Sequence, residues 1–317
     1  MRVVLIHEAQ LPVTAYGGTE RVVWWLSKGL SEQGLEVTLA ALPGTQCEWA
    51  EVVYPDFRRP LEPQLPGYDV YQYFNTPEFR PERPYAVNIG GNGRPGERFL
   101  PNTVFVSQDH ARRHGAECFV HNGLDPSEYV FQERKNRSLL FLAKASWKVK
   151  NVTGAQRIAR SARWPLEVVG GERWLLKNWR GTQWLGMLGG RPKAEAIARN
   201  AGLLFPVLWN EPFGLAVVEA LVSGTPVLAT PWGSLKELVP AQVGRLCASE
   251  REFREAVANL GDFKAKDCRD WALAHFTYTQ MAAGYRKLYE RVLQGVALNS
   301  REPVTQAGEM GLRELPR

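Results

Sequence analysis

The chain has 317 residues, of which 44% are hydrophobic and 23% are charged, and its formal net charge is +6. This composition excludes disordered and fibrous proteins, and the length favours two α/β-sized domains over one. The charge is uneven, because residues 1–135 carry 13 Lys and Arg against 17 Asp and Glu, so the positive field belongs to the rest of the chain.

The first part of the chain alternates strand, helix and strand. We expect a buried strand at Val3–Ile6, a helix at Thr19–Gln33 and a strand at Val37–Ala41, with Gly17 and Gly18 in the loop before the helix. This order is typical of a right-handed parallel unit that opens a doubly wound sheet. Further strands are predicted at Val70–Tyr73, Ala86–Ile89, Val104–Val106 and Phe119–His121.

A second alternation follows a predicted hinge at residues 122–137, where turn-forming and charged residues cluster. Its strands are expected at Leu139–Ala143, Leu166–Val169, Gln183–Leu185, Leu203–Val207 and Val227–Ala229, and its helices at Gly154–Ala162, Lys193–Ala201 and Gly214–Ser223. The sequence therefore predicts an α/β protein with two Rossmann-like, doubly wound parallel-sheet domains, 1–134 and 135–278, facing each other across a cleft. A last helix is expected at 279–296, and a polar tail at 299–317 is expected to be disordered.

Cysteine usage and hydropathy predict the compartment. The four cysteines are far apart, without a Cys-x-x-Cys pair or a histidine at zinc-ligand spacing, which favours a reducing cytoplasm and no structural metal. The apolar start, Val3–Ile6, is too short for a signal peptide, and no uncharged stretch approaches the ~20 residues of a spanning helix. We therefore expect a soluble cytoplasmic protein.

The uneven charge suits an anionic small molecule, a nucleic acid or an acidic membrane surface. We expect no nucleic acid, because the arginines are scattered among acidic residues and no aromatic and basic recognition segment is present. Peripheral contact with an acidic membrane stays open, as does a basic surface that is simply solvated. The sequence does not indicate an oligomeric state.

Two glycine-rich segments could lie against a ligand. Residues 91–96 read G-x-G-x-x-G, but Pro101 and the next strand follow too soon for the helix that an NAD site requires, so we interpret them as a loop. Gly17 and Gly18 stand where a ligand can approach the backbone and where a helix start supplies N–H groups. A tight turn without a ligand is the alternative for this pair.

The segment from Asn210 to Glu219 is the most informative in the chain. Glu219 lies in a predicted helix, and its neighbours three and four residues away include no basic residue. A carboxylate there needs hydrogen-bond donors, and a ribose diol would satisfy both oxygens. Glu211 lies after a strand, where open α/β sheets bind ligands. The alternatives are a helix-end carboxylate for Glu211 and a buried pair with a distant arginine for Glu219.

Cationic side chains follow the first strand of the second domain. Lys144, Lys148 and Lys150 could neutralise a diphosphate there, or could be simply solvated. The chain contains no Asp-x-Asp, which disfavours a metal-bound diphosphate. No histidine forms a hydrolase set with a serine or cysteine. His7 ends the first strand and could face a ligand, although a packing role explains it equally well.

Several of these segments together resemble the retaining glycosyltransferases of family 4, which have the two-domain GT-B architecture. The similarity is strongest over Leu203–Val239, where Glu211 and Glu219 match the Glu-x7-Glu signature of the family. It extends to Gly17–Val23, Asn122–Asp125 and Val168–Gly171. In such proteins the last helix packs back on the first domain, so we expect the same here.

The resemblance implies roles for individual residues. Glu219 would hold the ribose of a nucleotide sugar, and Glu211 would hold hydroxyls of the donor sugar. The implied donor-binding residues are Gly17, Gly18, Lys144, Lys148, Lys150, Gly170, Glu211, Pro212, Phe213, Gly214, Leu215 and Glu219. Of these, Glu211, Lys144, Lys150 and Gly18 would act in catalysis.

The sequence departs from the family in two places. Ala143-Lys144 stands for the Gly-Arg of the diphosphate clamp, and Lys150 comes one residue late for its lysine, with Lys148 as a rival. Gly90 occupies the slot of a histidine that the family often carries. The acceptor-side candidates are His7, Gly90 and Asn92.

The resemblance thus predicts a metal-independent, cofactor-free, retaining glycosyltransferase. It would move a sugar from a UDP- or GDP-sugar, bound by the second domain, to an unknown acceptor on the side of the first. A catalytically weak sugar-nucleotide-binding relative and a sugar-nucleotide epimerase or hydrolase of the same architecture are the alternatives.

Overall fold

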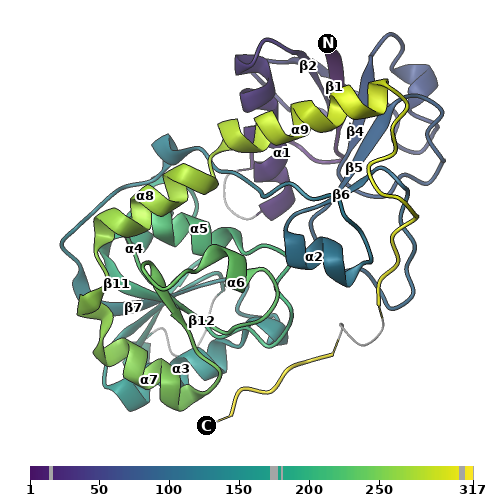
Figure 1. The fold of residues 1–317 in the computed structure, drawn as a ribbon. Coiled ribbons are helices and arrows are strands. Elements are labelled where there is room, and N and C mark those ends of the chain that lie inside the picture. Colours follow the sequence, from purple (N-terminus) through teal and green to yellow (C-terminus); the bar gives the residue numbers. More distant parts are fainter. Residues whose placement is uncertain (14–16, 172–177, 180, 307–310, 317) are drawn as a thin grey trace. The chain divides into compact units, whose positions relative to one another are not determined.

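The computed structural model describes residues 1–13, 17–171, 178, 179, 181–306 and 311–316. Their contacts divide them into two compact units. Unit 1 consists of the described residues of 1–124 and 276–306, and unit 2 of those of 125–275 and 311–316. In each unit, helices pack on a mainly parallel sheet (Figure 1).

Unit 1 is built on a six-stranded parallel sheet with the order β3-β2-β1-β4-β5-β6. Its strands are β1 (Arg2–Ile6), β2 (Glu36–Ala40), β3 (Glu51–Val53), β4 (Val70–Tyr73), β5 (Tyr85–Ile89) and β6 (Thr103–Phe105). Its α-helices are α1 (Gly18–Glu32), α2 (Gln108–Arg113) and α9 (Tyr278–Leu293). Val3, Val4 and Leu5 of the central strand β1 are fully buried, because a covered parallel sheet has no solvent face, and this explains the continuous apolar run.

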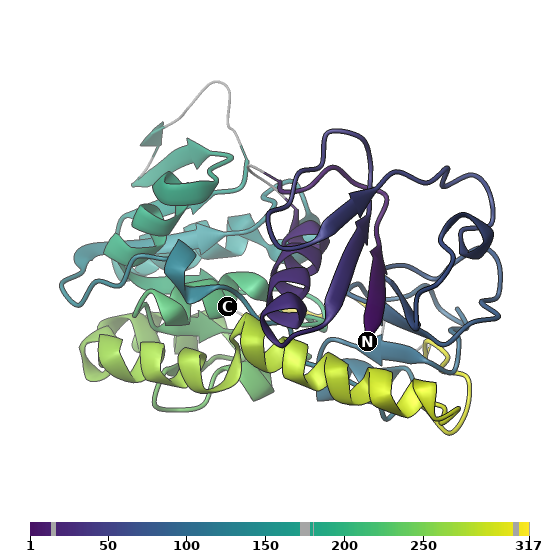
Figure 2. The ribbon, with the colours of Figure 1, turned by 90° about the horizontal axis from the view of Figure 1, so that it is seen from above.

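The last helix, α9, packs beside α1 within unit 1, as Figure 2 shows. Gly29 of α1 permits this close approach, because a Cβ atom there would lie only 2.8 Å from the Cβ atom of Ala282. On the inner face of α9, the buried hydroxyl of Tyr285 accepts a hydrogen bond of 2.6 Å from the side-chain amide of Asn88 in β5. The helix that follows unit 2 in the sequence is therefore part of unit 1.

Unit 2 contains a seven-stranded sheet with the order β13-β12-β11-β7-β8-β10-β9. Its strands are β7 (Asn136–Leu142), β8 (Leu166–Val169), β9 (Asn178–Trp179), β10 (Thr182–Gly186), β11 (Asn200–Phe205), β12 (Val227–Ala229) and β13 (Gly244–Leu246). Its α-helices are α3 (Val152–Ala162), α4 (Gly190–Arg199), α5 (Leu215–Val222), α6 (Leu235–Leu238), α7 (Glu250–Ala258) and α8 (Ala265–His275). When the antiparallel edge strand β9 is left out and the other strands are numbered along the chain from β7, unit 2 has the same strand order as unit 1 numbered from β1. This order is the Rossmann arrangement.

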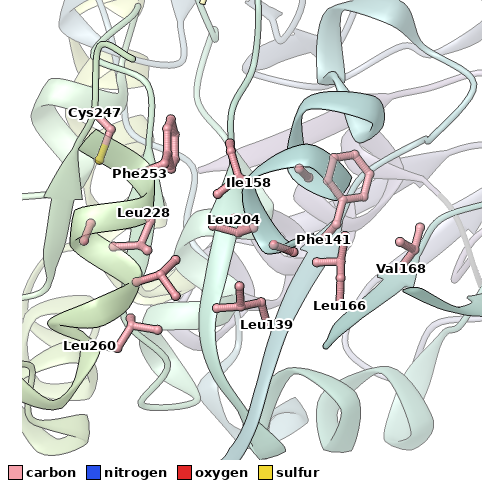
Figure 3. Packing of buried hydrophobic residues seen from close by; sticks show 14 residues of the cluster. Leu139, Phe141, Ile158, Leu166, Val168, Leu204, Leu228, Cys247, Phe253 and Leu260 are labelled. Atoms are coloured by element: carbon pink, nitrogen blue, oxygen red, sulfur yellow. The ribbon is translucent and has the colours of Figure 1, made fainter. Parts of the chain in front are cut away.

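The hydrophobic core of unit 2 holds strands β7 and β11 in place, and each of these strands leads into a polar loop. Leu139 and Phe141 of β7 and Leu204 of β11 pack with Ile158 of α3 and Phe253 of α7, all of them fully buried (Figure 3). Burial of each such side chain contributes about 1.5–3 kcal/mol. Strands β7 and β11 therefore present their carboxyl ends from a rigid base.

The boundary between the units lies after Leu124, whereas the sequence placed it at 134/135. The segment that follows is held by unit 2. The Lys135 ammonium donates hydrogen bonds to the carbonyls of Ala198 and Ser223, at the ends of α4 and α5, and its burial lowers the pKa of Lys135 to about 8. The predicted hinge at 122–137 therefore extends too far into unit 2.

Several elements differ from those expected. Strands β3, β9 and β13 and helices α2, α6, α7 and α8 were not predicted, and most of these elements are short. Phe119–His121 is not a strand, since only Phe119 forms a bridge, to Phe105. The helix predicted to reach Ala201 ends at Arg199, because β11 begins at Asn200.

The polar tail is ordered where the structure describes it. Asn299 is buried, and its side-chain oxygen accepts hydrogen bonds from the N–H groups of Glu117 and Cys118, while Val304 forms a bridge with Arg98. The expectation of disorder is therefore wrong for residues 299–306, because local polarity does not reveal these partners. No helix within the described ranges is long and apolar enough to span a bilayer.

Candidate functional site

The polar loops of unit 2 meet where its strand order reverses. β7 and β11 are neighbours in the sheet, and the chain leaves them for loops at their carboxyl ends, the usual position of ligands in open α/β sheets. The two loops lie side by side, because the N–H of Leu208 donates a 2.7 Å hydrogen bond to the carbonyl of Val149. This place gathers the predicted lysines and Glu211.

Lys150 and Glu211 form the centre of this loop cluster. The Lys150 ammonium donates to Oε1 and Oε2 of Glu211 at 2.9 and 2.8 Å, and the indole N–H of Trp209 donates to Oε2 at 2.6 Å. Both charged side chains are largely buried, with 12% of Lys150 and 7% of Glu211 exposed. The Lys150 ammonium also lies over the rings of Phe205 and Trp209, at 5.3 and 4.8 Å.

The loop after β7 has a defined backbone that brings Lys150 to this position. Residues 148–150 form a 3-10 turn, and Asn151 follows in the left-handed region at φ 58°. The Asn151 side chain accepts from the N–H of Gly154, so it caps α3, and it donates to the carbonyl of Pro206 at 2.9 Å. Asn151 thus joins this loop to the end of β11 and to α3.

Gly170 is required beside this loop for steric reasons. A Cβ atom at this residue would lie 2.0 Å from the carbonyl oxygen of Ala143, and its φ of 116° is unfavourable for other residues. The role of Gly170 in the structure is to let the ends of β7 and β8 approach at Ala143, the residue before Lys144.

The segment before α5 places backbone N–H groups next to Glu211. Gly214 has a φ of 100° and lies immediately before α5, whose first residue is Leu215. Phe213 and Pro212 are buried, and the Phe213 carbonyl accepts a 2.6 Å hydrogen bond from the Ser234 hydroxyl. This region therefore combines a fixed backbone with the positive end of a helix dipole.

Glu219 is buried in α5, and its carboxylate has protein donors. Only 2% of the residue is exposed. Its Oε1 accepts hydrogen bonds of 2.7 Å from the Tyr129 hydroxyl and from the Lys193 ammonium of α4. Glu219 therefore does form a buried ion pair, with a lysine in place of the arginine that the sequence suggested, and its contact with a ribose stays a proposal.

The remaining lysines differ in their surroundings. Lys144 is half-buried, and its ammonium lies 5.2 Å from the ring centre of the exposed Trp147. Lys148 is exposed. Of the two rivals for the downstream lysine, Lys150 is the one that contacts Glu211.

The candidates in unit 1 form a separate, less charged set. His7 directly follows β1 and is buried against the ring of Phe74 in an edge contact of 5.9 Å. Neither of its ring nitrogens has a hydrogen-bond partner among the described residues. Burial lowers the pKa of His7 below its usual value, although the carboxylates of Glu20 and Glu8 oppose this. His7 is therefore predominantly neutral at pH 7.

Gly17 and Gly18 lie at the start of α1. Gly17 precedes the helix with a φ of 155°, and its carbonyl accepts hydrogen bonds from the backbone and the guanidinium of Arg21. Gly18 is the first residue of α1. Gly17 and Gly18 therefore shape the start of α1, as expected for a tight turn. Their contact with a ligand stays a proposal.

Gly90 and Asn92 follow β5. A Cβ atom at Gly90 would meet only ordinary contacts, at 3.8 Å from Thr19 and 3.9 Å from Asn88. The Asn92 side-chain oxygen accepts a 2.9 Å hydrogen bond from the buried Arg113. No helix follows residues 91–96 before β6, which agrees with their interpretation as a loop.

Three residues of the unit 2 cluster were missed from the sequence. The sequence gives a weak indication of Trp209, because the indole N–H of a tryptophan two residues before a candidate carboxylate can donate a hydrogen bond to it. It gives no indication of Tyr129 and Lys193, since they come from a loop and from α4. Within the ranges that the structure describes, no three His, Cys, Asp or Glu side chains gather as metal ligands.

Comparisons with known proteins agree with this arrangement. Residues 134–262 match the model of the family described as "Glycosyl transferases group 1". Over 101 residues the chain is 28% identical to a probable sucrose-phosphate synthase of Thermosipho melanesiensis. That match covers 31% of the chain and 24% of the relative, so it spans about a quarter of the relative's length.

Two solved structures are similar over almost the whole chain. AviGT4, a glycosyltransferase involved in avilamycin A biosynthesis, is 24% identical with a TM-score of 0.79, and the match covers 93% of this chain and 98% of that one. HepE of Anabaena, in complex with UDP and glucose, is 15% identical with a TM-score of 0.66 over 92% and 99% of the two chains. The fold is that of GT-B glycosyltransferases.

Proposed function

We propose that the chain is a retaining glycosyltransferase that uses a UDP- or GDP-sugar as donor and needs no metal. The observation that carries the proposal is the Lys150–Glu211 pair at the carboxyl ends of β7 and β11, inside the segment that matches the group 1 model. The complex of HepE with UDP and glucose supports a nucleotide-sugar donor. The acceptor stays unspecified.

The hydrogen-bond capacity of this pair suits a donor sugar. A carboxylate offers about four acceptor sites, and Glu211 uses three of them for Lys150 and Trp209. Oε1 retains one site, which can accept a hydroxyl of the donor sugar. Trp209 and Lys150 hold the carboxylate in place, so the sugar meets a preorganised acceptor.

Positive charge close to Glu211 suits the leaving diphosphate. An ammonium has three N–H donors, and two of those of Lys150 point at Glu211, which leaves one for a phosphate oxygen. Lys144 and the N–H groups before α5 would add to this field. Bond cleavage transfers negative charge to the diphosphate, so groups that stabilise it lower the barrier. In this scheme Glu219 would contact the ribose beside Lys193 and Tyr129.

Unit 1 would supply the acceptor side. In a retaining transfer without an evident base, the leaving phosphate can take the proton of the acceptor hydroxyl. His7, Gly90 and Asn92 would then bind the acceptor rather than remove its proton. We propose Gly17 and Gly18 as the backbone that lies closest to the donor in this unit.

A ligand titration tests the proposal. Thermal unfolding is measured with UDP, GDP, UDP-glucose and GDP-mannose, with and without EDTA. A binding donor at about 100 times its Kd stabilises the protein by roughly 2.7 kcal/mol. We expect one nucleotide class to raise the melting temperature and EDTA to leave that rise unchanged. A protein that binds none of these ligands would contradict the proposal.

Product analysis separates the alternatives. An epimerase or hydrolase turns over the donor without an acceptor, and a binding relative turns over nothing. A transferase releases the nucleoside diphosphate faster when its acceptor is present and gives a product with the anomeric configuration of the donor.

A further inference from the structure

The C-terminal residues 311–316 belong to unit 2 and lie against the loop that carries Glu211. The N–H of Arg313 donates a 2.8 Å hydrogen bond to the carbonyl of Leu208. Leu208 in turn donates from its own N–H to Val149, the residue before Lys150. Three backbone segments are thus joined by hydrogen bonds. Leu208 lies between Arg313 and Val149, the residue before Lys150.

The side chain of Arg313 makes a second contact with the same loop, at Asn210. Its Nε donates a 3.0 Å hydrogen bond to the side-chain oxygen of Asn210, which is buried and directly precedes Glu211 in the chain. Arg313 itself is exposed. A solvent-accessible guanidinium is therefore oriented by a fixed partner at the edge of the candidate donor site.

Two further contacts anchor the same segment. Leu315 packs against the hydrophobic core of unit 2, and the carbonyl of Pro316 accepts a 2.7 Å hydrogen bond from the N–H of Glu250. Because the backbone of Arg313 and the residues that follow it are held, little backbone entropy remains to be lost when Arg313 meets a ligand.

The charges of the loop cluster leave a role for another cation. Glu211 and Lys150 neutralise each other, and both are largely buried. The diphosphate of a nucleotide sugar carries two negative charges, which the half-buried Lys144 and the exposed Lys148 would share with a further cation at this edge. Arginine binds phosphate through a planar fork of N–H groups and stays charged at all relevant pH values.

We propose that Arg313 is a diphosphate-binding residue, contributed to the donor site by the C-terminal segment 311–316. This inference rests on the proposed function, because it assumes a nucleotide-sugar donor at Lys150 and Glu211. It adds a residue that lies far from the other candidates in the sequence and outside the segment that matches the family model. A purely structural clip on Asn210 is the competing explanation.

Two substitutions distinguish charge from structure. Arg313→Gln removes the charge and keeps a polar side chain, whereas Arg313→Lys keeps the charge and loses the fork. Isothermal titration measures binding of UDP and of uridine, with GDP and guanosine in parallel. We expect Arg313→Gln to weaken diphosphate binding about tenfold and to leave nucleoside binding unchanged, while Arg313→Lys recovers part of the loss, since the field of a single cation acts on the phosphates alone.

Arg301→Ala is the matched control, because Arg301 is also exposed near the C-terminus but donates to Gly115 in unit 1. It should bind UDP and GDP like the wild type. The inference is overturned when Arg313→Gln binds the diphosphate normally, or when it loses diphosphate and nucleoside in equal proportion. A wild-type chain that binds neither UDP nor GDP contradicts the proposed function, and the role of Arg313 with it.

Discussion

The two sheets have the same strand order, yet the side chains at their equivalent reversal points differ in chemistry. In unit 2, a buried ion pair between Lys150 and Glu211 follows β7 and β11. In unit 1, the neutral imidazole of His7 packs against Phe74 at the ends of β1 and β4. One backbone plan therefore carries a charged site in one unit and a neutral, aromatic one in the other.

In the proposed function, this difference divides one reaction between two similar units. A carboxylate and an ammonium in a fixed, largely buried geometry suit a donor that carries hydroxyls and a diphosphate. A neutral imidazole beside an aromatic ring suits an uncharged hydroxyl compound. The fold supplies the position in both cases, and a few side chains at the strand ends set what is bound.

The largest effect on stability should come from breaking the ion pair between Lys193 and Glu219, which is more deeply buried than the pair between Lys150 and Glu211. Lys193→Met removes the ammonium that donates to Oε1 of Glu219 and keeps the Tyr129 hydroxyl, and loss of one partner of a buried pair costs about 3–5 kcal/mol. Denaturation followed by hydrogen exchange should show unit 2 destabilised and unit 1 unchanged.

The double variant Lys193→Met with Glu219→Leu removes both charges, so it should regain most of the lost stability. Its nucleotide affinity then decides the role of Glu219. Recovered stability with lost nucleotide binding supports the ribose contact, whereas recovered stability with normal binding makes the pair purely structural.

The next largest effect is expected on the transfer rate when Glu211 is substituted. Glu211→Gln keeps the size of the side chain but loses the charge that holds Lys150, so we expect transfer to fall by about 100-fold, or roughly 2.7 kcal/mol in barrier height. Initial rates at saturating donor measure it. Glu195→Gln, an exposed surface carboxylate paired with Arg191, is the control and should transfer normally. Equal rates for both variants would remove Glu211 from the reaction.

The neutral character of unit 1 predicts a pH dependence. Burial lowers the pKa values of His7, His110 and His114 in the folded protein. Below pH 6.5 these histidines therefore bind more protons in the unfolded chain than in the folded unit. The free energy of unfolding falls as the pH falls. The limit is about 1.4 kcal/mol per pH unit for each proton that only the unfolded chain binds.

Hydrogen exchange of unit 1 peptides between pH 7.5 and 5 measures this effect after correction for the intrinsic exchange rate. His7→Phe removes one of the three groups, so its stability should depend less steeply on pH than that of the wild type. A slope that the substitution leaves untouched would mean that His7 is protonated in the folded protein.

The smallest effect is expected at Gly90. Because a Cβ atom there meets nothing closer than 3.8 Å, Gly90→Ala should change the free energy of unfolding by less than about 0.5 kcal/mol. Thermal denaturation measures it. A large loss of stability would show that the glycine is needed by the backbone, and a normal stability with altered transfer would place the acceptor beside it.

Much of this architecture could be predicted from local patterns. The apolar run of β1, the amphipathic α1 and α9 and the strands β4, β8 and β12 follow from periodicity, which is a property of neighbouring residues. The three-residue strands β3 and β13 escaped detection, since each includes an exposed charged residue and, unlike β12, neither is a continuous apolar run. The order of residues 299–306 escaped as well, because Asn299 finds its partners 182 and 181 residues away.

The sequence by itself determined the α/β class and the order of the longer strands and helices, and it singled out Glu211, Glu219 and the three lysines as candidates, because these lie in short, dense segments. Only the tertiary structure decided that Lys150 pairs with Glu211, that Lys193 and Tyr129 bind Glu219 and that Arg313 reaches Asn210. The physical reason is that a buried charge needs partners, and the chain supplies them from any element that folding brings within a few ångströms.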